Sequence, residues 1–118
     1  MAKQVGNGHY KNMLQNAPNK LESVSNEHRA LALLRLLFRA PAYRSNELLL
    51  YDWLSEIGLA CTSSQLRRQV RELEETELLE ISDVKGNVVV ELSSRGAEVA
   101  EGRLIIEGVL RPAPECTY

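Results

Sequence analysis

The apolar positions between residues 25 and 102 recur in blocks that predict four helices and one β-hairpin. The first helix is expected to begin with a cap at Ser25 or Asn26 and to end before Pro41, because proline disfavours helical backbone in the residue that precedes it. Leucines surround most of its circumference, a pattern typical of a helix at the centre of a core.

Two further helices are predicted from caps followed by apolar stripes at helical spacing. Each begins after a residue whose side chain can accept a hydrogen bond from the first turn of the helix. The predicted caps are Ser45 or Asn46 for a helix over residues 47–57, and Thr62 or Ser63 for a helix over residues 64–76.

A hairpin and a last helix complete the pattern. Residues 78–83 and 88–92 are aliphatic and β-branched runs, and residues 84–87 hold a turn signal. Ser93 can cap a last helix, which Gly102 ends. The order helix, helix, helix, hairpin, helix predicts a mainly α chain with a small β-hairpin, the winged helix-turn-helix. In this fold the third helix enters the major groove of DNA, and the hairpin, or wing, contacts the backbone beside it.

Two segments flank the predicted winged-helix domain of residues 25–102. Residues 1–24 are poor in apolar side chains, so we expect a flexible N-terminal arm, which could also pack on a partner subunit. Residues 103–118 hold one apolar run and two prolines, and we expect an extended C-terminal tail that docks on the core or on another chain. A chain of 118 residues fits one domain.

Three segments between His28 and Gly102 carry a family resemblance; they read LRLLFRAPAYRSNELLLYDWLSEIGL, SSQLRRQVRELEETELLEI and ELSSRGAEVAEGR. They resemble the small winged-helix proteins of Mu-like bacteriophages, which are similar to arsenic-repressor-type transcriptional regulators. The resemblance implies a winged-helix fold. Metal-sensing regulators of that type carry cysteine ligands in the helix that corresponds to residues 47–53, where this chain has none. We therefore expect no metal and no cofactor.

The net charge does not by itself favour nucleic acid. The chain has 14 basic and 16 acidic residues, a sum of −2, whereas DNA-binding domains are commonly basic. The charge is unevenly spread, with +2 over residues 1–24, zero over residues 25–76 and −4 over residues 77–118. Binding to DNA would therefore depend on a local basic strip, and we expect it to be weak and sensitive to salt.

Candidate DNA contacts lie on the third predicted helix, opposite its apolar stripe, at the margin of the stripe or near the helix N-terminus, and on the wing. Arginine can bind a guanine edge through two hydrogen bonds or pair with a phosphate, and a helix N-terminus attracts anions. The predicted contacts are Ser64, Gln65, Arg67, Arg68 and Arg71 on this helix, Lys85 and Asn87 on the wing, and Arg95 on the last helix.

A simpler interpretation of the same residues stays open. Arg68 and Arg71 each precede a glutamate by four residues, Glu72 and Glu75, and such pairs would form a solvated, salt-bridged face. The wing triplet around Lys85 is also what a polar tight turn requires.

Two functions from different classes follow. The leading hypothesis is a sequence-specific or architectural DNA-binding protein, a small phage transcriptional regulator that binds double-stranded DNA through its third helix and wing. We expect a homodimer, whose subunits would associate through the first and last helices and the arm. The alternative is a winged-helix interaction module that binds and inhibits a host protein, which the acidic C-terminal part and its apolar run over residues 104–106 favour.

Other classes of protein are not expected. The chain shows no nucleophile motif, phosphate-binding glycine loop or convincing acid–base pair, so we expect no enzyme. It shows no membrane span and no signal pattern, so the cytoplasm of the bacterial host is the expected location. Cys61 and Cys116 would stay reduced there, and neither has metal-ligand spacing.

Overall fold

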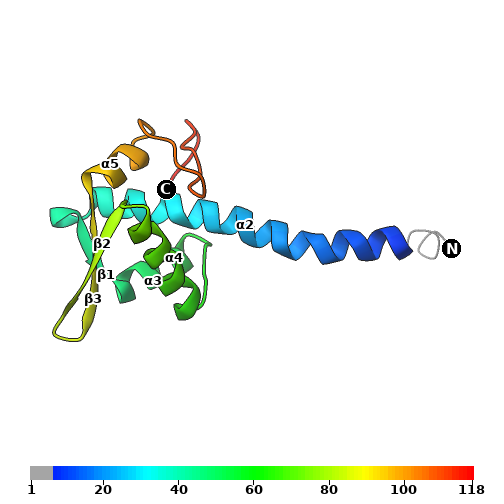
Figure 1. The fold of residues 1–118 in the computed structure, drawn as a ribbon, viewed down its shortest axis with the longest axis horizontal. Coiled ribbons are helices and arrows are strands. Elements are labelled where there is room, and N and C mark those ends of the chain that lie inside the picture. Colours follow the sequence, from blue (N-terminus) through cyan, green and yellow to red (C-terminus); the bar gives the residue numbers. More distant parts are fainter. Residues whose placement is uncertain (1–6) are drawn as a thin grey trace.

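A computed structural model describes the backbone of residues 7–118 and the side chains of residues 20–118 (Figure 1). Four helices, one 3-10 turn and three strands follow one another along this part of the chain. They are α2 (Asn7–Arg39), the 3-10 turn η1 (Pro41–Tyr43), β1 (Arg44–Asn46), α3 (Glu47–Glu56), α4 (Ser63–Glu75), β2 (Leu79–Val84), β3 (Asn87–Leu92) and α5 (Ser94–Ala100). The predicted winged helix-turn-helix is confirmed. No helix in this described part is long and apolar enough to cross a membrane.

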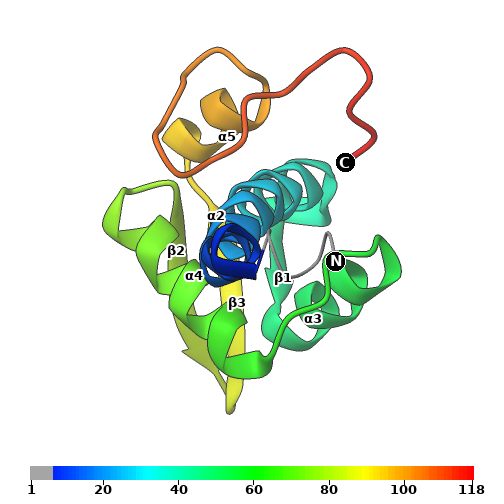
Figure 2. The same ribbon diagram turned by 90° about the vertical axis from the view of Figure 1, so that its right-hand side faces the viewer.

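Helix α2 forms the centre of the core, as its leucines predicted. Viewed down its axis, α3, α4, α5 and the sheet surround it (Figure 2). The side chains that fill the space between these elements are almost wholly buried. They include Leu31, Leu33, Leu34 and Leu37 of α2, Leu50 and Leu54 of α3, Leu66, Val70 and Leu73 of α4, Leu78 and Leu79 at the start of β2, Val90 of β3 and Val99 of α5.

The predicted start of the first helix is wrong, because α2 continues without a break from Asn7 through the expected cap. Asn26 does not act as a cap: its Oδ1 accepts a hydrogen bond from Arg29 Nη1 at 2.7 Å, and its carbonyl accepts one from Gln69 Nε2 at 2.5 Å. The Asn26 side chain, which the sequence suggests as a helix cap, is therefore engaged in a different hydrogen bond. Pro18 lies inside α2 and cannot donate a backbone hydrogen bond there, which weakens the projecting part.

The N-terminal half of α2 projects beyond the domain (Figure 1). Residues 7–24 thus continue a helix, where the sequence suggested a separate arm. Residues 1–6 of the expected arm lie outside the described residues. The flexibility of residues 1–24 stays a prediction.

The three caps on α3, α4 and α5 are confirmed. Asn46 Oδ1 accepts the backbone N–H of Leu49 at 2.8 Å, and Ser93 Oγ accepts that of Gly96 at 3.0 Å. Thr62 and Gln65 form a reciprocal capping box at the start of α4, with bonds of 3.1 and 2.9 Å. Local side-chain chemistry therefore sets where these helices begin.

The sheet has one more strand than the sequence predicts. β2 and β3 form the expected hairpin, and β1 pairs antiparallel with the other edge of β3, so that Ser45 faces Val90. A strand of three residues is too short to show a period of two. At the wing tip Lys85 and Gly86 both have positive φ, 55° and 84°, as a tight two-residue hairpin turn requires.

The C-terminal segment, residues 103–118, folds back onto its own core. The backbone N–H of Leu110 donates to the carbonyl of Glu27 at 3.0 Å, and the Tyr118 hydroxyl lies 2.9 Å from His28 Nδ1. Arg39 Nη1 donates to the Tyr118 backbone oxygen at 3.0 Å. Of the two expected modes, docking on the core is the one in this structure.

Candidate nucleic-acid interface

Helix α4 presents an arginine-rich face to solvent. Its apolar side, with Leu66, Val70 and Leu73, is buried against α2 and the sheet, as the periodicity predicts. Arg67 and Arg68 on the opposite side have side chains that are 58% and 61% exposed. Ser64 and Arg71 are exposed on the same helix, so the predicted face exists.

The arginines of α4 do not pair with the glutamates four residues on. Arg67 Nε donates to both carboxylate oxygens of Glu47, the first residue of α3, at 3.0 and 3.3 Å. Arg68 lies 3.8 Å from the carboxylate of Glu22 on α2. Within residues 20–118, neither the Arg68–Glu72 nor the Arg71–Glu75 pair forms, and Arg71 makes no ion pair. The structure therefore does not show the salt-bridged face of the simpler interpretation.

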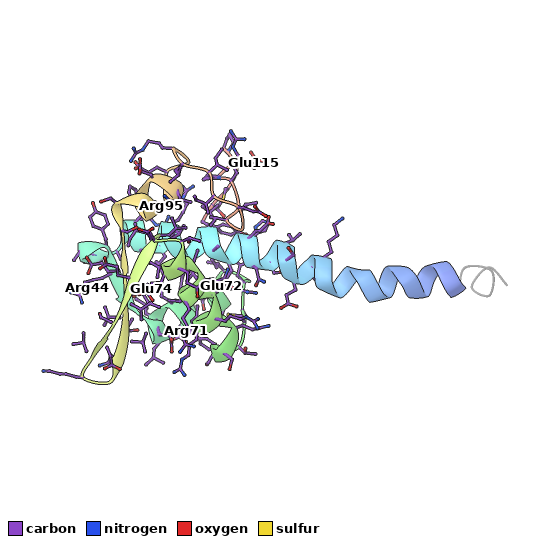
Figure 3. All side chains as sticks on the ribbon, viewed as in Figure 1. Arg44, Arg71, Glu72, Glu74, Arg95 and Glu115 are labelled. Atoms are coloured by element: carbon purple, nitrogen blue, oxygen red, sulfur yellow. The ribbon has the colours of Figure 1, made fainter. Side chains whose placement is uncertain are left out.

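A groove of about 350 Å³ separates α4 from the wing. Its walls bring two arginines of α4 opposite the turn of the hairpin. Figure 3 shows Arg71 on the side of α4 that faces away from α2, the side to which the wing also extends. The groove is lined by Glu47, Arg67, Val70, Arg71, Ile81, Asp83, Gly86 and Val88.

The wing tip carries the exposed residues Lys85 and Asn87. Asp83 Oδ1 accepts the backbone N–H of Gly86 at 2.9 Å, and Asn87 Nδ2 donates to the carbonyl of Val84 at 3.3 Å. The side chains of Asp83 and Asn87 therefore stabilise the turn, in line with the polar-turn interpretation. The Lys85 side chain is an exposed cation at the tip.

Gln65 and Arg95 are placed less favourably than the sequence suggests. The Oε1 atom of Gln65 is engaged in the capping box, so only its amide N–H groups remain for a ligand. Arg95 borders a hollow with Glu74, Glu77 and Glu80. Figure 3 shows Arg95 and Arg71 on opposite sides of the domain. The structure thus brings Arg67, Arg68 and Arg71 together on one face of α4, places Arg67 and Arg71 beside the wing, and leaves Arg95 apart.

Sequence reasoning missed Glu47 as part of this face. Glu47 follows the cap Asn46, and an acidic residue in the first turn of a helix needs no further explanation in a sequence. Its contact with Arg67 spans 20 positions, and no local pattern reports such a pair.

The half-buried Cys61 lies in the loop before α4, packed against the core. Burial raises the pKa of this thiol, although the nearby Arg29 guanidinium lowers it in part. This environment fits a small core filler better than a reactive thiol. Among the side chains that the structure describes, no three His, Cys, Asp or Glu residues meet at a point where they could hold a metal ion.

One comparison with solved structures agrees with this fold. No family model matches the chain. The structure of Lactococcus lactis ZitR in its apo form is similar over 85% of this chain and 67% of that one, with a TM-score of 0.50 and 19% identity, which is a likeness of fold. The uncharacterized protein gp26 of Escherichia phage Mu is 36% identical over 94 residues, which cover 80% of this chain and 97% of that protein. The chain therefore belongs to the family of gp26 of Escherichia phage Mu.

Proposed function

We propose that this protein is a DNA-binding transcriptional regulator of a phage, with α4 in the major groove and the wing on the adjacent backbone. The observation that carries the proposal is the cluster of three exposed arginines on α4, two of which line the groove beside the wing of a winged helix-turn-helix. Membership of a phage protein family supports it.

The residues take different roles in this proposal. Arg67 and Arg71 line the groove beside the wing and are assigned to base edges. Arg68 and Lys85 are assigned to phosphates, because each is an exposed cation at the border of the face. Further hydrogen bonds to the DNA backbone are assigned to Ser64, the Gln65 amide and Asn87. Arg95 receives no contact, because it lies beside three glutamates.

A salt titration tests this proposal. The purified chain is titrated with random duplexes and with duplexes selected from a random pool, at about 50 and 200 mM salt. Arg68→Ala should weaken binding to all sequences and reduce the salt slope by about one. Arg71→Ala should mainly reduce the preference for the selected duplex. Arg111→Ala, which changes an exposed arginine of the C-terminal segment, is the matched control and should change neither. Absence of binding at the lower salt would refute the proposal.

We also propose a homodimer that forms through the projecting half of α2. Leu21 and Val24 are 67% and 42% exposed there, three positions apart and thus on one side of the helix. The expected use of the face near α5 is less favourable, since the chain's own C-terminal segment packs there. Light scattering at tens of micromolar should give twice the chain mass, and Leu21→Glu should halve it. A wild-type monomer at that concentration would exclude this interface.

The second candidate function is binding to a host protein. The apolar run over residues 104–106 supports it less than the sequence suggests, because Leu104 and Ile106 pack against the core and only Ile105 is exposed. Leu48 and Leu49 on α3, however, are 70% and 55% exposed, and adjacent apolar side chains of this kind occur in protein interfaces. Under this alternative a host protein co-purifies with the wild type but not with a folded Leu48→Glu/Leu49→Glu variant, and DNA titrations show no binding.

A further inference from the structure

The ion pair between Glu47 and Arg67 holds one edge of an arginine on the proposed DNA face. Arg67 Nε donates to both oxygens of the Glu47 carboxylate, at 3.0 and 3.3 Å. The Glu47 side chain is only 13% exposed, whereas that of Arg67 is 58% exposed. In the part of the chain with described side chains, no hydrogen bond engages the two Nη atoms of Arg67.

A guanidinium group held in this way keeps a second binding edge. Its donors form a rigid planar fork, so a contact at Nε fixes the plane in which the two terminal amino groups lie. Those two groups can together bind the O6 and N7 acceptors of a guanine. An arginine fixed before binding loses less conformational freedom when the base pairs with it.

We propose that Glu47 is a positioning residue that orients Arg67 for one base and thereby contributes to sequence specificity. The inference rests on the proposed DNA-binding function and goes beyond it in naming how specificity arises. Glu47 also brings a negative charge close to the DNA backbone. Its removal should therefore have two opposite effects, weaker discrimination between sequences and tighter binding to unrelated DNA.

The test compares a duplex selected by the wild type from a random pool with a scrambled duplex of equal length. Dissociation constants for both are measured at one salt concentration, and their ratio is the discrimination. Glu47→Ala should reduce this ratio about tenfold, in the range that a bidentate base contact supplies, and should tighten binding to the scrambled duplex. Glu47→Gln keeps an acceptor for Arg67 and should restore part of the ratio.

Controls separate positioning from stability and from simple charge. Glu56→Ala removes an exposed charge from the same helix and should leave the ratio unchanged. Arg67→Ala should lower the ratio at least as much as Glu47→Ala, and the double variant should lose no more than Arg67→Ala, because Glu47 acts through Arg67. Thermal melts show which variants are folded, and Glu47→Gln replaces Glu47→Ala if the latter is not.

The outcomes distinguish this inference from the proposed function. If the wild type binds DNA with sequence preference but Glu47→Ala and Glu47→Gln keep the full ratio, the positioning role is overturned and the proposed function stands. A Glu47→Ala effect of equal size in the Arg67→Ala background overturns it as well. If the wild type binds no duplex, both the inference and the proposed function fail.

Discussion

Substitution of Gly96 by alanine should destabilise the domain, although alanine is the better helix former. Gly96 is buried in the first turn of α5, and a Cβ atom added there would lie 2.0 Å from the backbone oxygen of Leu78 and 2.7 Å from Leu92 Cδ1. The same Leu78 oxygen accepts the backbone N–H of Ser93 at 3.1 Å. Ser93 Oγ also donates to the carbonyl of Glu77 at 2.7 Å. The start of α5 is thus fixed directly against the strand that begins the wing.

The expected loss follows from opposing contributions. In an open helix interior, alanine in place of glycine stabilises by about 1 kcal/mol. Here the added carbon would approach a backbone oxygen about 1 Å closer than Cβ atoms do in proteins, so α5 must move as a unit. Overpacking of this kind costs about 1–3 kcal/mol, and loss of the Leu78–Ser93 hydrogen bond adds about 1 kcal/mol. We expect a net loss of about 2 kcal/mol, which lowers the Tm by roughly 8–16 °C.

Thermal and urea unfolding followed by circular dichroism measure this loss. Gly58→Ala is the matched control, because Gly58 has a φ of 81° but no atom within 4 Å of an added Cβ, so it reports backbone strain alone. The urea midpoint of Gly96→Ala should fall while the slope stays that of the wild type. A Gly96→Ala chain as stable as the wild type, or less affected than Gly58→Ala, would show that α5 does not pack on the strand as described.

Three further predictions concern the supports of α4. Thr62→Ala should cost about 1 kcal/mol in urea unfolding through loss of the capping box, whereas Thr62→Ser should cost little; equal effects would contradict the cap. Gln69→Leu should cost about 1–3 kcal/mol, because it removes two buried hydrogen bonds, one from Arg29 and one to the Asn26 carbonyl, while Glu75→Leu on the exposed side should cost less than 0.5 kcal/mol. Burial raises the pKa of Cys61 above its ordinary value of 9.0, so at pH 8 iodoacetamide should react with it more slowly in the folded chain than in urea. A faster reaction in the folded chain would contradict the burial. The stability linked to this thiol is present below its ordinary pKa and is lost as pH rises through the raised value.

The elements that the sequence predicts well are those set by neighbours in the chain. The capping box of Thr62 and Gln65 and the stripe of Leu66, Val70 and Leu73 involve residues a few positions apart, so α4 is found within one residue at each end. The wing is predicted by two β-branched runs around a turn, because the conformation of the turn depends only on the backbone angles of its own residues.

The features that the sequence missed depend on distant contacts. β1 exists because three residues pair with β3, about 45 positions later. Helix α2 continues through Asn26, whose carbonyl accepts a hydrogen bond from Gln69 of α4, 43 positions later. Arg95 sits among glutamates of α4 and β2 because Gly96 permits α5 to pack against that strand. None of these contacts leaves a periodic signal.

The charges on α4 show how such distant contacts change a functional interpretation. Pairs four residues apart on an exposed helix are worth only about 0.2–0.5 kcal/mol, so they yield to any better partner. Arg67 finds one in the largely buried carboxylate of Glu47, and Arg68 lies near Glu22 of α2. Arg71 is then left without an ion pair among the described side chains. The total charge of −2 is therefore a poor guide to this face, where the fold decides which arginines remain open to a phosphate or a base.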